Sequence, residues 1–171
     1  MKKIIALLLA VMMLATVLTA CSKKEPAVTT IDKELTAIID EMYAIYNPNL
    51  AVATIPIDLA DEYALPAFTG LTDASLIKEA VASEAMIGAQ AYSVALVRLN
   101  SSEDAATVAE AMKNGIDQRK WICVEADDLR VVACGDVVVL VMIDSQLDVK
   151  TDSMIEAFGT VVGAPFSVDI R

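Results

Sequence analysis

The chain has 171 residues, of which 24 are acidic, 13 are basic and none is histidine, and its formal net charge is −11. Without histidine it cannot form a Ser-His-Asp or Cys-His catalytic arrangement, or a histidine-ligated zinc site. The negative charge repels nucleic acid and anionic lipid headgroups, so we expect no nucleic-acid partner. Glycine-rich phosphate loops and Cys-x-x-Cys motifs are also missing, and we expect no cofactor and no metal.

The first 20 residues have the pattern of a secretory signal peptide. Lys2 and Lys3 form a positive flank, and residues 4–17 contain no charged side chain. This apolar stretch is shorter than the roughly 20 residues that a permanent membrane-spanning helix needs. Residues 1–20 are therefore predicted to be a removable signal peptide and not an anchor helix.

The end of this segment, Leu18-Thr19-Ala20-Cys21, resembles the lipobox of bacterial lipoproteins. The resemblance implies that a diacylglycerol is attached to Cys21 and that cleavage makes Cys21 the mature N-terminus. An ordinary secretory signal with an incidental cysteine is the alternative, but the position of Cys21 directly after a complete apolar region favours the lipoprotein. An anchor of two or more acyl chains binds a membrane stably. We therefore expect a protein held on the extracytoplasmic face of the cell membrane by its N-terminal lipid.

The mature chain divides into a short stalk and one domain. Residues 21–30 are predicted to be a lipidated, polar stalk, and residues 31–171 are enough for a single domain with a substantial core. Removal of residues 1–20 takes away two basic residues and no acidic one, which leaves 11 basic against 24 acidic side chains and a net charge of about −13. This charge favours a domain that stands off an anionic membrane surface.

The first expected helix begins near Ile31 and ends at Asn47-Pro48. Thr29 and Asp32 have the spacing of a capping box. Apolar residues follow at spacings of four, three, four and three, as on one face of a helix: Ile31, Leu35, Ile38, Met42 and Ile45. Tyr43 and Tyr46 are predicted at the edge of the core rather than as a pair that stacks on a ligand.

Residues 50–70 are expected to be extended chain with a short helical turn. This segment contains three acidic residues, Asp58, Asp61 and Glu62. They could bind a hard cation, but they lack the alternating ligands and the glycine of a calcium loop, so helix-capping or solvated carboxylates are the favoured interpretation.

Two hairpins are predicted in the remainder of the chain. Residues 78–87 and 91–99 form the first, although the alanines of residues 78–87 are also compatible with a helix. Residues 130–134 and 137–143 form the second, joined at Gly135-Asp136. Residues 137–141 are so continuously apolar that they should be a central strand covered on both faces.

A second helix is expected after Ser101, with Asp104 at the spacing of a cap, ending between Asn114 and Arg119. The last helix is expected over residues 151–162 and ends at Gly163. These elements predict an α+β fold: a single domain with an antiparallel sheet built from two β-hairpins, packed with about three helices and covered mainly on one side.

Two interpretations of Cys123 and Cys134 remain open. An exported domain meets oxidising conditions, so the two could form a disulfide. Because Cys134 belongs to an apolar run, two small buried thiols are the favoured interpretation.

The order of elements resembles that of the lipoproteins that carry the domain of unknown function 4358. The similarity lies in the pattern of residues 91–97, 108–118 and 131–141. This resemblance implies a lipoprotein of Gram-positive bacteria but no particular activity.

We expect an interaction or ligand-binding module of the cell envelope, with an envelope protein as its partner. The alternative is a carboxylate-based enzyme that acts on cell-wall polymer, which requires a groove with two acids of opposed pKa shifts; a flat acidic face beside an apolar patch favours the binding module.

Overall fold

Six antiparallel strands form one sheet in the order β1-β2-β3-β5-β4-β6. The computed structural model describes residues 30–171, so the predicted signal peptide, Cys21 and all of the stalk except Thr30 lie outside the described residues. The strands are β1 (Val52–Ile57), β2 (Ile77–Ala85), β3 (Tyr92–Leu99), β4 (Asp128–Cys134), β5 (Val137–Ile143) and β6 (Val168–Ile170). Both predicted hairpins are confirmed, as β2 with β3 and β4 with β5.

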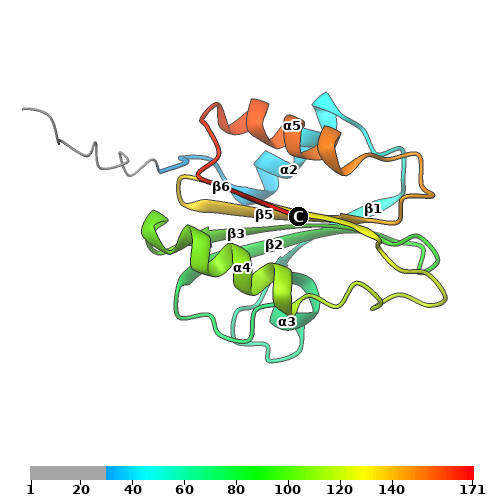
Figure 1. Cartoon of the computed structure of the whole chain (residues 1–171), viewed down its shortest axis with the longest axis horizontal. Coiled ribbons are helices and arrows are strands. Elements are labelled where there is room, and N and C mark those ends of the chain that lie inside the picture. Colours follow the sequence, from blue (N-terminus) through cyan, green and yellow to red (C-terminus); the bar gives the residue numbers. More distant parts are fainter. Residues whose placement is uncertain (1–29) are drawn as a thin grey trace, which may run out of the picture.

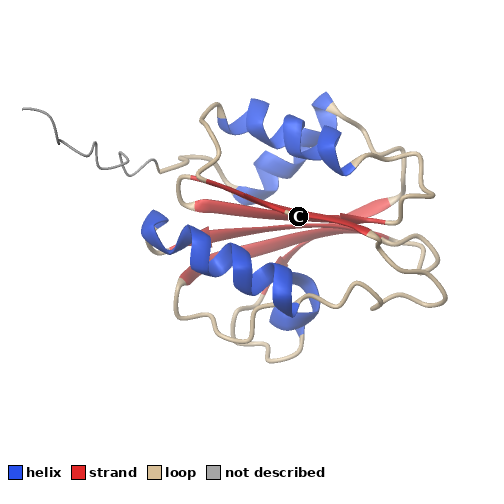
Figure 2. Cartoon of the chain, viewed as in Figure 1, coloured by secondary structure: helices blue, strands red, loops and turns tan. Residues whose placement is uncertain are grey.

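Within residues 30–171, four α-helices cover the two faces of the sheet (Figures 1 and 2). Helices α2 (Leu35–Ile45) and α5 (Thr151–Val162) lie on one face, and α3 (Ala64–Thr69) and α4 (Ala105–Gly115) lie on the other. The α+β class and the single antiparallel sheet are therefore confirmed, whereas the expected cover mainly on one side was wrong. A periodic stripe shows that a helix has an apolar face, but it does not show which face of the sheet that helix covers.

The central strands explain why two helical layers are needed. Every residue of β3 and β5 is buried. Alternate residues of β3, beginning with Tyr92, pack with α2 and α5, and the other set, which includes Ala95, packs with α4. A strand that is apolar on both faces must be covered on both, as predicted for residues 137–141.

The first helix starts later than its apolar pattern predicts. It begins at Leu35, with Glu34 as N-cap and no side-chain cap hydrogen bond, and Ile45 at its end is exposed. The backbone of Ile31 is instead bound by side chains from β3 and from the β4–β5 turn, as described below. Thr29 of the expected capping box lies outside the described residues.

The later helices agree closely with their sequence signals. Ser101 accepts a hydrogen bond from the backbone N–H of Glu103 at 3.3 Å, in the 3-10 turn η1 (Ser102–Asp104) that leads into α4. Asp104 itself makes no side-chain cap hydrogen bond, so only the Ser101 half of the expected cap is formed. Helix α5 ends at Gly163, which has a φ of 66° in the left-handed region that glycine adopts easily. Within residues 30–171, no helix is long and apolar enough to span a membrane.

Candidate functional site

Four loops meet at one end of the sheet, which we call the loop end: residues 46–51, 86–91, 116–127 and 144–150. Backbone hydrogen bonds join them, from Met86 N to the Ala51 carbonyl (2.8 Å) and from Asp144 N to the Ala91 carbonyl (2.8 Å). A longer one runs from Ile122 N to the Gly88 carbonyl (3.4 Å). In Figure 1 the last three of these loops lie together at the right, beyond the ends of β3 and β5. The loop end is thus a preformed surface.

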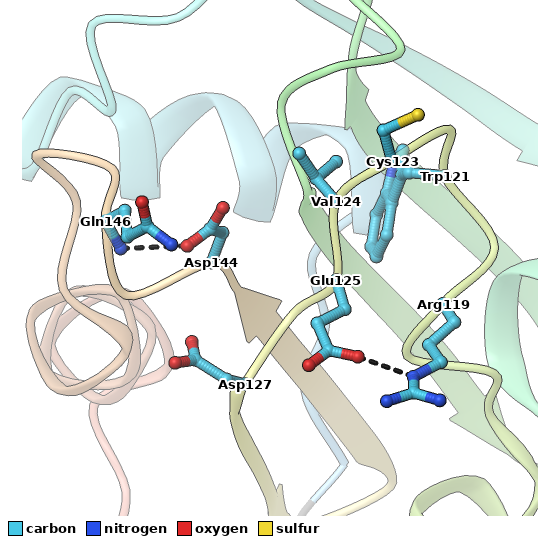
Figure 3. Close-up of a pocket in the computed structure, with 8 residues that line it drawn as sticks. All are labelled: Arg119, Trp121, Cys123, Val124, Glu125, Asp127, Asp144 and Gln146. Atoms are coloured by element: carbon cyan, nitrogen blue, oxygen red, sulfur yellow. Dashed lines mark hydrogen bonds and ion pairs between the residues drawn. The ribbon is translucent and has the colours of Figure 1, made fainter.

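A pocket of about 500 Å³ opens between loops 116–127 and 144–150. Figure 3 shows carboxylates from both loops around it, with an indole ring on one side. Its lining residues are Arg119, Trp121, Cys123, Val124, Glu125, Asp127, Asp144 and Gln146. None of these was recognised from the sequence as a set, because they follow no helical or strand period.

Hydrogen bonds hold the carboxylates of the pocket in place. Asp127 accepts from both the hydroxyl and the backbone N–H of Ser145, each at 2.7 Å, which links the two loops. Both bonds stabilise the charged form and so hold the pKa of Asp127 below its usual range, and the bond from the Ser145 hydroxyl has the larger effect. Glu125 forms an ion pair with Arg119 at 2.5 Å. The Asp144 carboxylate accepts from the Gln146 backbone N–H at 2.9 Å. Three carboxylates and one guanidinium therefore line the pocket, and only Glu125 is paired with that guanidinium.

An apolar surface adjoins this pocket. Met86, Ile87 and Ile122 expose 70%, 52% and 77% of their surface, and we call these three side chains the apolar loop patch. Ile122 lies between two pocket residues, and its backbone bond to Gly88 places loop 86–91 beside loop 116–127. The arrangement is an acidic pocket next to exposed apolar groups.

Lys120 fixes the indole at the edge of the pocket. Its ammonium group lies 5.2 Å from the centre of the Trp121 ring and 5.1 Å from that of Phe68. The same group forms an ion pair with Glu84 and donates to the Ala67 carbonyl at 2.8 Å. Trp121 is thereby held between the helical layer and the pocket.

The two cysteines of the domain lie in different surroundings. Cys123 is exposed in the pocket and Cys134 is buried in β4, and both are free thiols. The expectation of buried thiols was therefore right for Cys134 and wrong for Cys123, which lies in an irregular loop with a φ of 65°. The disulfide between Cys123 and Cys134, which was the alternative, is not formed in this structure.

The opposite end of the sheet holds the start of the described chain. Arg98, which is only 7% exposed, donates to the Ile31 carbonyl at 2.7 Å and to the Lys33 carbonyl at 2.5 Å. Asp136 accepts from the Ile31 backbone N–H at 2.8 Å, and Glu79 pairs with Arg98 at 2.5 Å. We call Arg98, Asp136 and Glu79 the N-terminal clamp. Sequence reasoning placed Arg98 on a strand but missed this role.

The register of the sheet separates the clamp from the loop end. Arg98 pairs with Val137 at one end of the β3–β5 ladder, and Tyr92 pairs with Ile143 at the other. Asp144, which lines the pocket, follows Ile143 directly. Six residues of extended strand make the two ends about 20 Å apart.

A second cavity, of about 420 Å³, lies between α4 and residues 70–77. Its lining is largely apolar and includes Leu71, Leu76 and Val108. Gly70 and Gly115 approach each other so closely beside it that neither has room for a Cβ atom. The polar lining of the cavity comes from Thr72, Asp73, Thr107 and Asn114.

The acidic and aromatic residues singled out from the sequence have structural roles. Asp61 accepts from the backbone N–H groups of Tyr63 and Ala64, at 2.8 and 2.9 Å, so the helix-capping interpretation is confirmed for it. Within residues 30–171, no group of three His, Cys, Asp or Glu side chains is arranged to hold a metal ion. Tyr43 donates to the Ser83 hydroxyl at 2.7 Å at the edge of the core, as predicted.

Comparisons with known proteins found no match to this chain. No family model, no curated protein and no solved structure matches it. The similarity to the lipoproteins with the domain of unknown function 4358 therefore stays a prediction.

Proposed function

We propose that this chain is a lipid-anchored extracytoplasmic protein, a lipoprotein of the 4358 domain family, and that its domain is an interaction module of the cell envelope. The signal pattern and the lipobox at Cys21 support the location. The N-terminal clamp lies at the end of the sheet opposite the loop end, which supports the loop end as the interaction surface.

This placement supports the loop end as the surface left open by an N-terminal anchor. The linker from Cys21 to Ile31 has about ten residues and spans at most about 35 Å when fully extended. It joins the domain at the clamp, so the clamp end is the end from which the tether to the membrane leaves. The loop end is the end of the sheet remote from the tether, where a partner in the envelope can reach it.

The chemistry of the loop end favours binding over catalysis. The pocket lies beside exposed apolar side chains, a combination typical of interaction sites. An acid catalyst on cell-wall polymer needs a carboxyl group with a raised pKa. The pKa of Asp127 is displaced in the opposite direction by its bonds to Ser145, which argues against Asp127 as that acid.

Replacing the anchoring cysteine tests the location. The wild-type chain should fractionate with membranes and carry a diacylglyceryl mass on Cys21, and Cys21→Ala should lose both properties. A Cys21→Ala chain that remains membrane-bound, or a wild-type N-terminal peptide without lipid, contradicts the proposal.

Site-specific cross-linking in intact cells tests the surface. A photoreactive residue at Ile122 on the loop end should capture a discrete envelope protein, whereas one at the exposed Lys78, near the start of β2 at the clamp end, should not. Capture at Lys78 alone would show that the wrong end of the domain has been chosen.

A further inference from the structure

The apolar loop patch is not covered by any other part of the described chain. It contains three of the six large hydrophobic side chains that residues 30–171 expose. The backbone bond from Ile122 to Gly88 and that from Met86 to Ala51 hold the loops that carry them. A preformed surface loses little conformational entropy when it binds a partner, so this patch is suited to docking.

Charge decides what kind of partner fits. Glu125, Asp127 and Asp144 line the adjoining pocket, and the one guanidinium there, Arg119, is already paired with Glu125. The whole chain also has a net charge of −11. A second copy of this chain and an anionic lipid surface are both repelled, whereas a cationic partner is attracted at long range.

The geometry of the pocket suits side chains that end in a cation. A volume of about 500 Å³ admits a lysine or arginine side chain, and carboxylates lie on two of its sides (Figure 3). The Trp121 ring lines the same pocket, and aromatic rings attract cations, as this one already does with Lys120. The apolar loop patch then lies where the neighbouring apolar residues of the partner would pack.

We infer that the loop end binds a basic amphipathic polypeptide segment of a partner protein. Its cationic side chains enter the pocket of Glu125, Asp127 and Asp144, and its apolar side chains pack on Met86, Ile87 and Ile122. This inference rests on the proposed function and names the class of partner.

A binding titration with a defined probe tests the inference. The probe is an amphipathic helical peptide of leucine and lysine, about 14 residues long, added to the full lipidated chain in micelles of a neutral detergent. Trp121 is the single tryptophan of the chain, so its fluorescence reports on the pocket directly. We expect a saturable change that weakens with added salt, and none with a leucine and glutamate peptide of equal length. Identical responses to both peptides, or no response to either, would overturn the inference.

Matched variants then separate a specific site from general attraction to an acidic protein. Ile122→Ser and Glu125→Gln together remove one apolar and one charged group from the loop end. Tyr63→Ser and Glu110→Gln together do the same at exposed positions elsewhere. Anisotropy of the labelled peptide should show at least about tenfold weaker binding for the first pair and less than about twofold for the second. Equal weakening by both pairs would overturn the inference.

The outcome for the anchor is read independently. If Cys21 carries lipid and the peptide does not bind, the inference about the partner fails and the proposed location stands. If Cys21 carries no lipid, the proposed location fails whatever the peptide does.

Discussion

Arg98 and Asp136 form a buried ion pair, with Nη1 of the arginine 3.3 Å from Oδ2 of the carboxylate. Between them they bind the carbonyl and the amide of Ile31, and Arg98 also binds the Lys33 carbonyl. Buried polar groups are costly unless they are paired, and here the two side chains and the incoming backbone satisfy one another. Ile31, near the start of the described chain, is therefore part of the core.

Arg98→Met should destabilise the domain strongly. The change leaves the Asp136 carboxylate buried without its cation and the Ile31 and Lys33 carbonyls without a donor. Breaking a buried pair in this way costs about 3 kcal/mol, measured as the free energy of unfolding in urea. Lys33→Ala is the control, since it breaks the solvent-exposed pair with Glu41 and should cost less than about 1 kcal/mol. Equal losses in the two variants would mean that the clamp does not stabilise the fold.

Gly115→Ala should also destabilise, although alanine normally favours a helix over glycine. Gly115 is the last residue of α4, and the carbonyl oxygen of Gly70 occupies the space that a Cβ atom would need. Because both groups belong to the backbone, the helix must move, at a cost of about 1–3 kcal/mol. Thermal unfolding measures the loss.

Gly88→Ala is the matched control for that change. Apart from Gly88 and its two chain neighbours, no residue has an atom within 4 Å of the Cβ position at Gly88. The melting temperature of the Gly88→Ala variant should therefore stay close to that of the wild type. A Gly115→Ala chain as stable as Gly88→Ala would contradict the close approach of α4 to Gly70.

Local patterns account for the parts of the fold that the sequence predicted. The apolar run of residues 91–99 indicated a strand, in which Tyr92 and Ala95 pack on opposite faces, and Gly135, whose φ is 57°, marked the second hairpin. Both signals depend on residues that are close together in the chain. Helix α3 has only six residues, too few for a helical period to be recognised beyond a short turn.

The clamp and the pocket could not be predicted because their residues are far apart in the sequence. Arg98 meets the Ile31 carbonyl across 67 positions, and no local spacing indicates such a contact. Asp127 and Ser145 meet because the β4–β5 ladder brings loops 116–127 and 144–150 to one end of the sheet. Loop residues follow no period, so Trp121 and Ile122 carried no signal of their own.

The bond between Asp127 and Ser145 should make the pocket sensitive to acid. The folded pKa of Asp127 is lowered, so its stabilising bonds are fully present above the ordinary aspartate pKa of about 3.9 and are lost as the pH falls through the lower folded value. Carboxyl NMR titration should place the Asp127 midpoint below the ordinary value. Ser145→Ala should raise that midpoint part of the way, because the backbone N–H bond remains.

Asp169 is the internal control for this titration. Its pKa is also lowered, by its hydrogen bond to Arg130 and not by any group in the pocket. Its midpoint should not move in Ser145→Ala. If the Asp127 midpoint also stays unchanged in Ser145→Ala, the hydrogen bond from the Ser145 hydroxyl to Asp127 is contradicted.

The two free thiols should react at very different rates. Cys123 is exposed in the pocket, whereas Cys134 is buried, and burial together with the nearby charge of Asp136 raises the pKa of the Cys134 thiol. Thiolate is the reactive form, so a maleimide should label Cys123 quickly and Cys134 only after unfolding. Cys123→Ser should abolish the fast reaction, and Cys134→Ser should leave it unchanged. If both thiols are free, the wild-type domain should take up two labels when it is unfolded without a reducing agent. No label under these conditions would mean that Cys123 and Cys134 form a disulfide, for which one of them must move from its position in this structure.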